Sequence, residues 1–117
     1  MTSPRDHKTS GDDPITIMTI WEGSAEQVEE FIMQWRVRAE IMAAAPGFRD
    51  AKLHRAVSSQ ARFQLVNVAH WDSQAHLDAA HDNDEFRRSV RELHEDPKMQ
   101  ITGTPGVYEV AIVLGEE

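Results

Sequence analysis

The sequence predicts an α+β domain of the ferredoxin-like class, a βαββαβ antiparallel sheet with its helices on one face. Three observations favour this class. The chain starts with an alternating β-branched run, later segments carry apolar residues at helical spacing, and the elements follow the order strand, helix, strand, strand, helix, strand. Because both faces of the predicted sheet are apolar, we expect two copies to pack sheet against sheet as a homodimer.

The first strand is expected in the run ITIMTIWEG, where apolar and β-branched residues alternate. With a period of two, Ile15, Ile17 and Trp21 share one face of this strand. Met18 and Ile20 lie on the other face, so neither side of the strand is polar.

A helix is expected directly after this strand. Ser24 is a favourable N-cap, and Gln27 follows three residues later, where a capping box places a Glu or Gln. The helix should end at Pro46-Gly47, because proline and glycine interrupt helical structure. Its apolar face is predicted to hold Val28, Phe31, Ile32, Trp35, Ala39 and Met42.

Two further strands are expected at about Phe48–Val57 and Arg62–Trp71, joined by the hairpin loop SSQA. The next helical region starts at its N-cap Ser73 and breaks near Asp82-Asn83, where the asparagine can cap a second segment. The segment KMQITGTPG is rich in turn-forming residues and is predicted to be a loop. The segment VYEVAIVLG is predicted to be the last strand.

Length and composition indicate one soluble globular domain. The 117 residues are expected to form a disordered N-terminal tail at 1–13 and a single domain at 14–117. Twenty acidic against twelve basic residues give a formal net charge of −8, which disfavours binding to nucleic acid or to anionic membranes. The chain has no cysteine, and we find no signal peptide or membrane-spanning run, so we expect a cytoplasmic protein without thiolate chemistry.

The strand FQLVNVAHW carries polar side chains where a buried strand should be apolar. Period two places Asn67 and Trp71 on the same face as Phe63 and Leu65, and directs His70 to the opposite face. A buried Asn costs about 1–3 kcal/mol unless its amide is paired. Two interpretations follow. Either the Asn bonds to a helix end or backbone within a solid core, or a cavity between sheet and helices holds an aromatic, oxygenated ligand.

The segments VNVAHWDSQAHLDAA, DEFR and GTPGVYEV, with PGF at the helix-to-strand junction, resemble the antibiotic-biosynthesis monooxygenase family of dimeric α+β barrels. The resemblance covers about Ile15 to Gly115. One branch of that family oxidises polyketide anthrones to quinones with molecular oxygen and no cofactor. Its Asn four residues before a Trp matches Asn67 and Trp71, and its Arg after an apolar residue matches Arg87 after Phe86.

The resemblance therefore implies a cofactor-independent monooxygenase that binds a small aromatic substrate and oxygen. It implies Asn67, Trp71 and Arg87 as catalytic residues. Leu77 stands where that branch carries a Tyr, which argues against a tyrosine-based proton relay. The residues expected to bind substrate are Trp35, Phe63, Leu65, Leu77, His81 and Phe86.

No cofactor and no metal is expected. The haem-degrading branch of the family needs a His, a Trp and an Asn, and these positions align with Val90, Ala80 and Thr16. His76 and His81 are five residues apart, which is poor helical geometry for shared metal ligation. Two other functions stay open from the sequence: a polyketide cyclase or isomerase that uses the same pocket, and a non-catalytic dimer that binds a small ligand.

Overall fold

The computed structural model describes residues 13–115, so positions 1–12 of the expected tail lie outside the described residues. The strands of the described part are β1 (Ile15–Glu22), β2 (Phe48–Arg55), β3 (Phe63–Trp71) and β4 (Thr102–Tyr108). Its helical segments are the short 3-10 helix η2 (Ala25–Gln27) and the helices α1 (Val28–Ala43), α2 (Gln74–His81) and α3 (Asp84–Glu95).

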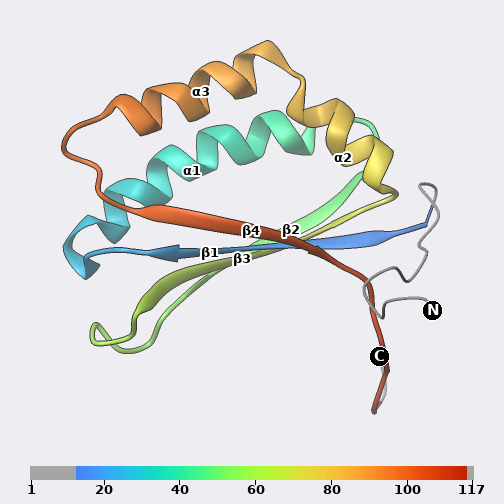
Figure 1. The fold of residues 1–117 in the computed structure, drawn as a ribbon, viewed down its shortest axis with the longest axis horizontal. Coiled ribbons are helices and arrows are strands. Elements are labelled where there is room, and N and C mark those ends of the chain that lie inside the picture. Colours follow the sequence, from blue (N-terminus) through green and yellow to red (C-terminus); the bar gives the residue numbers. More distant parts are fainter. Residues whose placement is uncertain (1–12, 116–117) are drawn as a thin grey trace, which may run out of the picture.

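The strands form one antiparallel sheet in the order β2-β3-β1-β4. The helices α1, α2 and α3 cover one face of this sheet, and no helix of the described chain covers the other (Figure 1). The ferredoxin-like α+β class predicted from the element order is therefore confirmed.

Alternation sorts the side chains of the two central strands between these faces. Ile15 and Trp21 of β1 are buried beneath the helices together with Leu65 and Trp71 of β3. Met18 points to the opposite face of β1 and is 39% exposed. The face that the sequence pattern assigned to the helices is the face that they cover.

The core beneath the helices consists of two clusters of buried residues. One cluster gathers around Trp71 of β3 and Leu77 of α2, and the other around Phe31 of α1 and Leu65 of β3. Full burial of a large apolar side chain stabilises the fold by about 1.5–3 kcal/mol. These clusters therefore hold α1 and α2 against the sheet.

The break in the second helical region lies where the sequence predicts it. Ser73 Oγ accepts a hydrogen bond from the backbone N–H of His76 at 3.1 Å, which caps α2. Asn83 Oδ1 accepts from the backbone N–H of Phe86 at 2.8 Å, which caps α3. Both side chains satisfy donors that a helix start leaves unpaired.

The capping box predicted for Ser24 and Gln27 does not form. Ser24 Oγ accepts from the backbone N–H of Glu26 at 3.1 Å, as an N-cap does. The side chain of Gln27 instead donates to the carbonyl of Lys98 and accepts from the backbone N–H of Gln100 at 2.9 Å. It is engaged by backbone groups of the α3–β4 loop, which need partners of their own.

The last strand lies earlier in the chain than predicted. β4 falls mostly within the segment KMQITGTPG, which was expected to be a loop, and it pairs with β1 so that Pro105 lies opposite Thr19. A proline lacks a backbone N–H and is tolerated here because β4 is an edge strand. Turn-forming residues are therefore poor indicators of a loop at the edge of a sheet.

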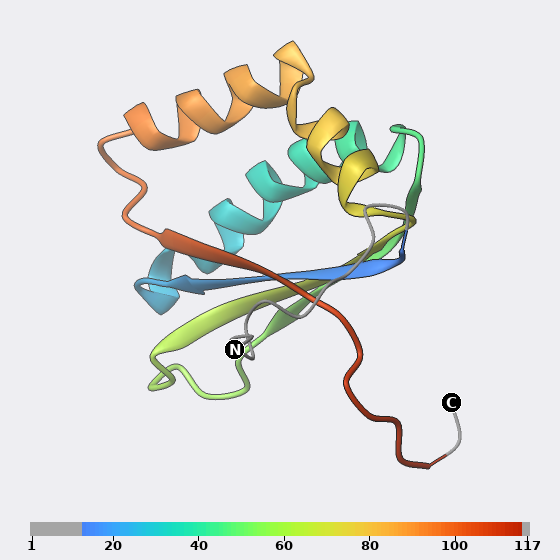
Figure 2. The same cartoon turned by 45° about the vertical axis from the view of Figure 1, so that its right-hand side comes forward.

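Residues 109–115 continue past β4 without a strand assignment and extend away from the body of the molecule (Figure 1, Figure 2). We call them the C-terminal arm. Four of its apolar side chains are between 64% and 86% exposed, namely Val110, Ile112, Val113 and Leu114. Contiguous exposed apolar groups are more common at surfaces that contact other molecules than elsewhere on a protein.

Candidate active site

A cavity of about 480 Å³ lies between the sheet and the helices. Its walls come from all four strands and from α1, α2 and α3, and most of the lining residues are apolar. This volume is within the range of about 300–1,000 Å³ that small-molecule sites occupy. Six of the nine predicted site residues line it: Trp35, Asn67, Trp71, Leu77, His81 and Phe86.

The other three predicted site residues lie outside this lining. Phe63 is 37% exposed beneath the guanidinium of Arg62, because a register shift at the end of β1 interrupts the alternation of β3. Leu65 is 1% exposed and belongs to the core cluster around Phe31. Arg87 follows Phe86 directly on α3 and is exposed, because neighbouring helical residues point in different directions. Arg87 therefore lies outside the cavity lining.

Asn67 lies at the centre of β3, opposite Thr19 of β1 and Leu53 of β2. Its Oδ1 atom is buried and has no hydrogen-bond partner among the described residues. An unpaired buried acceptor costs about 1–3 kcal/mol, and most such groups in proteins are paired. The solid-core interpretation required a bond from this amide to a helix end or backbone. The structure has a cavity at Asn67 instead, so a bound molecule can supply the partner.

All three tryptophans of the chain line the cavity. Trp71 is 2% exposed, and Phe48 packs edge-on against its ring with the centroids 5.3 Å apart. Trp21 lies against Phe31 with the centroids 5.2 Å apart. Together with Trp35 of α1, these rings give the cavity flat apolar walls, which suit a planar aromatic ligand.

Arg38 is the main residue of this site that the sequence analysis missed. It lies on α1, is 7% exposed and lines the cavity. Its guanidinium stands 5.4 Å from the centroid of the Phe31 ring. Burial lowers the pKa of Arg38 below its usual range. Its spacing in the sequence could have predicted this position. Arg38 falls three residues after Trp35 and four before Met42, so it lies within the apolar stripe of the helix.

His81 lies at the end of α2 and lines the cavity while remaining partly in contact with solvent. Its ring stacks on Phe86, with an interplanar angle of 7° and centroids 5.2 Å apart. Burial lowers the pKa of His81, and the nearby carboxylates of Asp78 and Asp82 oppose this effect. The imidazole is therefore neutral at neutral pH and can accept a proton from a bound molecule.

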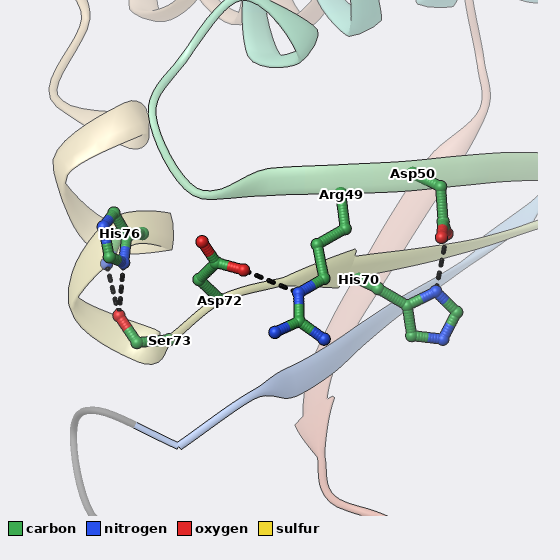
Figure 3. Close-up of polar contacts among 6 residues, drawn as sticks. All are labelled: Arg49, Asp50, His70, Asp72, Ser73 and His76. Atoms are coloured by element: carbon green, nitrogen blue, oxygen red, sulfur yellow. Dashed lines mark hydrogen bonds and ion pairs between the residues drawn. The ribbon is translucent and has the colours of Figure 1, made fainter.

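Other polar contacts around the β2–β3 end of the sheet lie outside the cavity lining (Figure 3). His70 Nδ1 lies 2.6 Å from Asp50 Oδ1, on the face of β3 opposite Trp71, as the alternation predicts. The Arg49 guanidinium donates to Asp72 at 2.6 Å. These contacts are exposed and connect β2 to β3 without reaching the cavity.

Two further classes of site were sought in the described part of the chain. Between residues 13 and 115 no group of three or more His, Asp or Glu side chains is arranged to hold a metal ion. The helices of this part are too short or too polar to cross a bilayer.

Residues 14–92 match the model of the family described as antibiotic biosynthesis monooxygenase. The chain belongs to this family. The match runs from the start of β1 into α3, so it includes most of the cavity and confirms the resemblance inferred from the sequence motifs. Membership in the antibiotic biosynthesis monooxygenase family supports a monooxygenase-type function. No curated protein matches the chain significantly.

Solved structures share this fold. A protein from Shewanella loihica PV-4, proposed to be a monooxygenase, is 28% identical with a TM-score of 0.70, and the alignment covers 86% of this chain and 97% of that one. SnoaB, a cofactor-independent oxygenase from Streptomyces nogalater, is 22% identical with a TM-score of 0.72, covering 89% and 99%. At 22% identity, the likeness to SnoaB shows the fold alone.

We predict that His81 titrates below the usual histidine pKa of 6.5, since burial disfavours its charged form. Because the pKa is lowered in the folded state, the stability linked to neutral His81 is complete above about pH 6.5 and is lost as the pH falls through the folded pKa. NMR titration of the imidazole carbon-bound protons measures this value. Asp78→Asn should lower it further, while Asp84→Asn should leave it unchanged. A midpoint at or above 6.5 in the wild-type protein would contradict this burial effect.

Proposed function

We propose that the chain is a cofactor-independent monooxygenase that oxidises an aromatic, polyketide-like substrate, an anthrone or a quinol, with molecular oxygen. The observation that carries this proposal is the buried Asn67 Oδ1 atom, which has no partner among the described residues and lies at a cavity walled by tryptophans. Flat apolar walls fit fused aromatic rings, and an unpaired amide oxygen fits a ring hydroxyl, which can donate a hydrogen bond to it. Family membership supports the oxygenase class.

The chemistry requires no external reductant. Loss of a proton from the anthrone methylene gives a delocalised phenolate-like anion, and oxygen then reacts at that carbon. One oxygen atom becomes the new carbonyl, and the other leaves as water with the two methylene hydrogens. The protein has to bind the rings, accept the first proton and stabilise the anion.

The lining residues can be assigned to these tasks. Asn67 and Trp71 can donate hydrogen bonds to the developing oxyanion through an amide NH2 and an indole N–H. His81, neutral at neutral pH, is positioned at the cavity to accept the proton. Leu77, 3% exposed, contributes an apolar wall and no proton relay. Arg87 has no part in this scheme, since it lies outside the lining.

Oxygen uptake tests this proposal. Purified, metal-stripped protein should consume oxygen when given a model anthrone and no cofactor. Asn67→Ala should lower turnover by about 10²–10³, the usual cost of losing one oxyanion donor. Trp71→Phe should also lower turnover, because it removes the indole N–H that donates to the oxyanion. The variant keeps an aromatic ring at this position. Arg88→Ala, an exposed position on α3, is the control and should retain activity.

Uptake that does not exceed spontaneous oxidation contradicts the monooxygenase proposal. Conversion of the substrate without oxygen would then indicate the cyclase or isomerase function. Binding without conversion would indicate the ligand-binding dimer.

We also propose that the protein is a homodimer joined through the open face of the sheet. On this face Met18 pairs across the strands with Val68, and Ile20 pairs with Val66, which makes an apolar patch that no helix of the described chain covers. The C-terminal arm adds further exposed apolar side chains. A second copy can cover both surfaces, since a two-fold dimer brings the same patch from each subunit into contact.

A charge on the open face should separate the subunits. Met18→Lys places an ammonium group in the proposed interface, so we expect sedimentation to report a dimer for the wild-type protein and a monomer for this variant. Met33→Lys is the matched control, because Met33 is 72% exposed on α1, and it should remain dimeric. A monomeric wild-type protein, or a dimeric Met18→Lys variant, contradicts the proposed interface.

A further inference from the structure

Arg38 differs from the other arginines whose contacts are known in this structure. Four exposed arginines form ion pairs with carboxylates: Arg36 with Glu40 at 3.2 Å, Arg49 with Asp72 at 2.6 Å, Arg55 with Glu29 at 2.6 Å and Arg62 with Glu22 at 2.9 Å. Arg38 is 7% exposed, and none of the ion pairs among the described residues includes it. Buried charges in proteins are normally paired, because removing a charge from water is costly.

The surroundings of Arg38 leave its hydrogen-bond donors available. The ring of Phe31 supports the guanidinium at 5.4 Å by a cation–π contact, which uses the charge but none of the N–H groups in the guanidinium plane. Arginine carries five N–H donors in a fixed planar fork, which matches the two oxygens of a carboxylate. Phe31 is fully buried and holds the guanidinium in place at the wall of the cavity.

The lining of the cavity is unusual for an acidic protein. The chain has a net charge of −8, yet no Asp or Glu of residues 13–115 lines this cavity. Besides Arg38, the ionisable side chains of the lining are His81 and His94, both of which can only be neutral or positive. The negative charge that would balance Arg38 is therefore absent from its walls, and a bound molecule can supply it.

We propose that Arg38 binds the carboxylate of an aromatic acid, so that the substrates of this cavity are aromatic carboxylates. The inference rests on the proposed function only in taking this cavity as the substrate site. The carboxylate binds at α1, and the rings lie between the tryptophan walls with an oxygen substituent at Asn67. Arg38 is thus a residue that sets specificity and orientation, apart from the groups that act on the reacting carbon.

Calorimetric titration with two ligands of the same shape tests this inference. The probes are 2-naphthoate, which is ionised at pH 7.5, and 2-naphthamide, which is neutral. The wild-type protein should bind the naphthoate about tenfold to a hundredfold more tightly, the usual gain from hydrogen bonds to a charged partner. Arg38→Met should remove this preference, and Arg38→Lys should retain part of it.

Arg36→Met is the matched control, because Arg36 lies on the same helix but is exposed and paired with Glu40. It should keep the full preference for naphthoate. If Arg38→Met does not fold, as judged by its circular dichroism spectrum, the Arg38→Lys variant and the wild-type ligand pair decide the question. Equal binding of the two ligands by the wild-type protein, or no binding of either, overturns the inference.

The outcome is separable from that of the oxygen assay. A protein that prefers naphthoate through Arg38 but consumes no oxygen retains the anion site and loses the monooxygenase function. A protein that oxidises anthrones but binds naphthoate and naphthamide equally retains the function and loses the anion site.

Discussion

The side chains of β1 and β3 are divided between two faces because these strands occupy the centre of the sheet. Each lies between two neighbours, so its backbone groups are paired on both sides and its side chains alternate, except at the register shift beside Phe63. This alternation turns Asn67 and Trp71 towards the helices and Met18 towards the open face. The cavity and the proposed dimer surface are therefore two consequences of one register, and a shift by a single residue would exchange them.

The helices cover the sheet without filling the space above its centre. Two core clusters hold α1 and α2 in place. A cavity remains between the sheet and the helices, with the Asn67 amide on one wall and the Arg38 guanidinium on another. Among the described residues Asn67 Oδ1 has no hydrogen-bond partner and Arg38 has no carboxylate partner, which lowers the stability of the free protein. This loss of stability is the cost that our proposal assigns to a binding site, where a ligand supplies the missing partners.

The local pattern of residues in the sequence predicted the structural features that depend on residues close by in the chain. The face of Asn67, the caps at Ser73 and Asn83 and the helix break follow from spacing and from side chains that bond within three residues. The features it missed depend on distant parts of the chain. Pro105 is compatible with a strand only because β4 lies at the sheet edge, and the Gln27 side chain bonds to a loop more than seventy residues away.

The candidate site, like the fold, was predictable where the orientation of a side chain depends on local periodicity. Six of nine expected residues line the cavity, since strand and helix periodicity decide which way they point. Phe63 lies outside the lining because of the register shift at the start of β3, which sequence alternation does not reveal. Arg38 was missed because a long charged side chain on an apolar stripe usually extends its charge into water. Only the packing of α1 over the sheet buries this one.

The free energy of unfolding of Asn67→Leu, measured without ligand by chemical denaturation, tests the central claim most directly. Leucine is close to asparagine in size and has no polar group to leave unpaired. If Asn67 is held unpaired for a ligand, the variant should be as stable as the wild-type protein or more stable. Asn83→Leu, which removes the cap of α3, should lose about 1 kcal/mol in the same experiment. A loss of about 1–3 kcal/mol for Asn67→Leu would show that this amide stabilises the fold through a bond of its own, and would contradict the account.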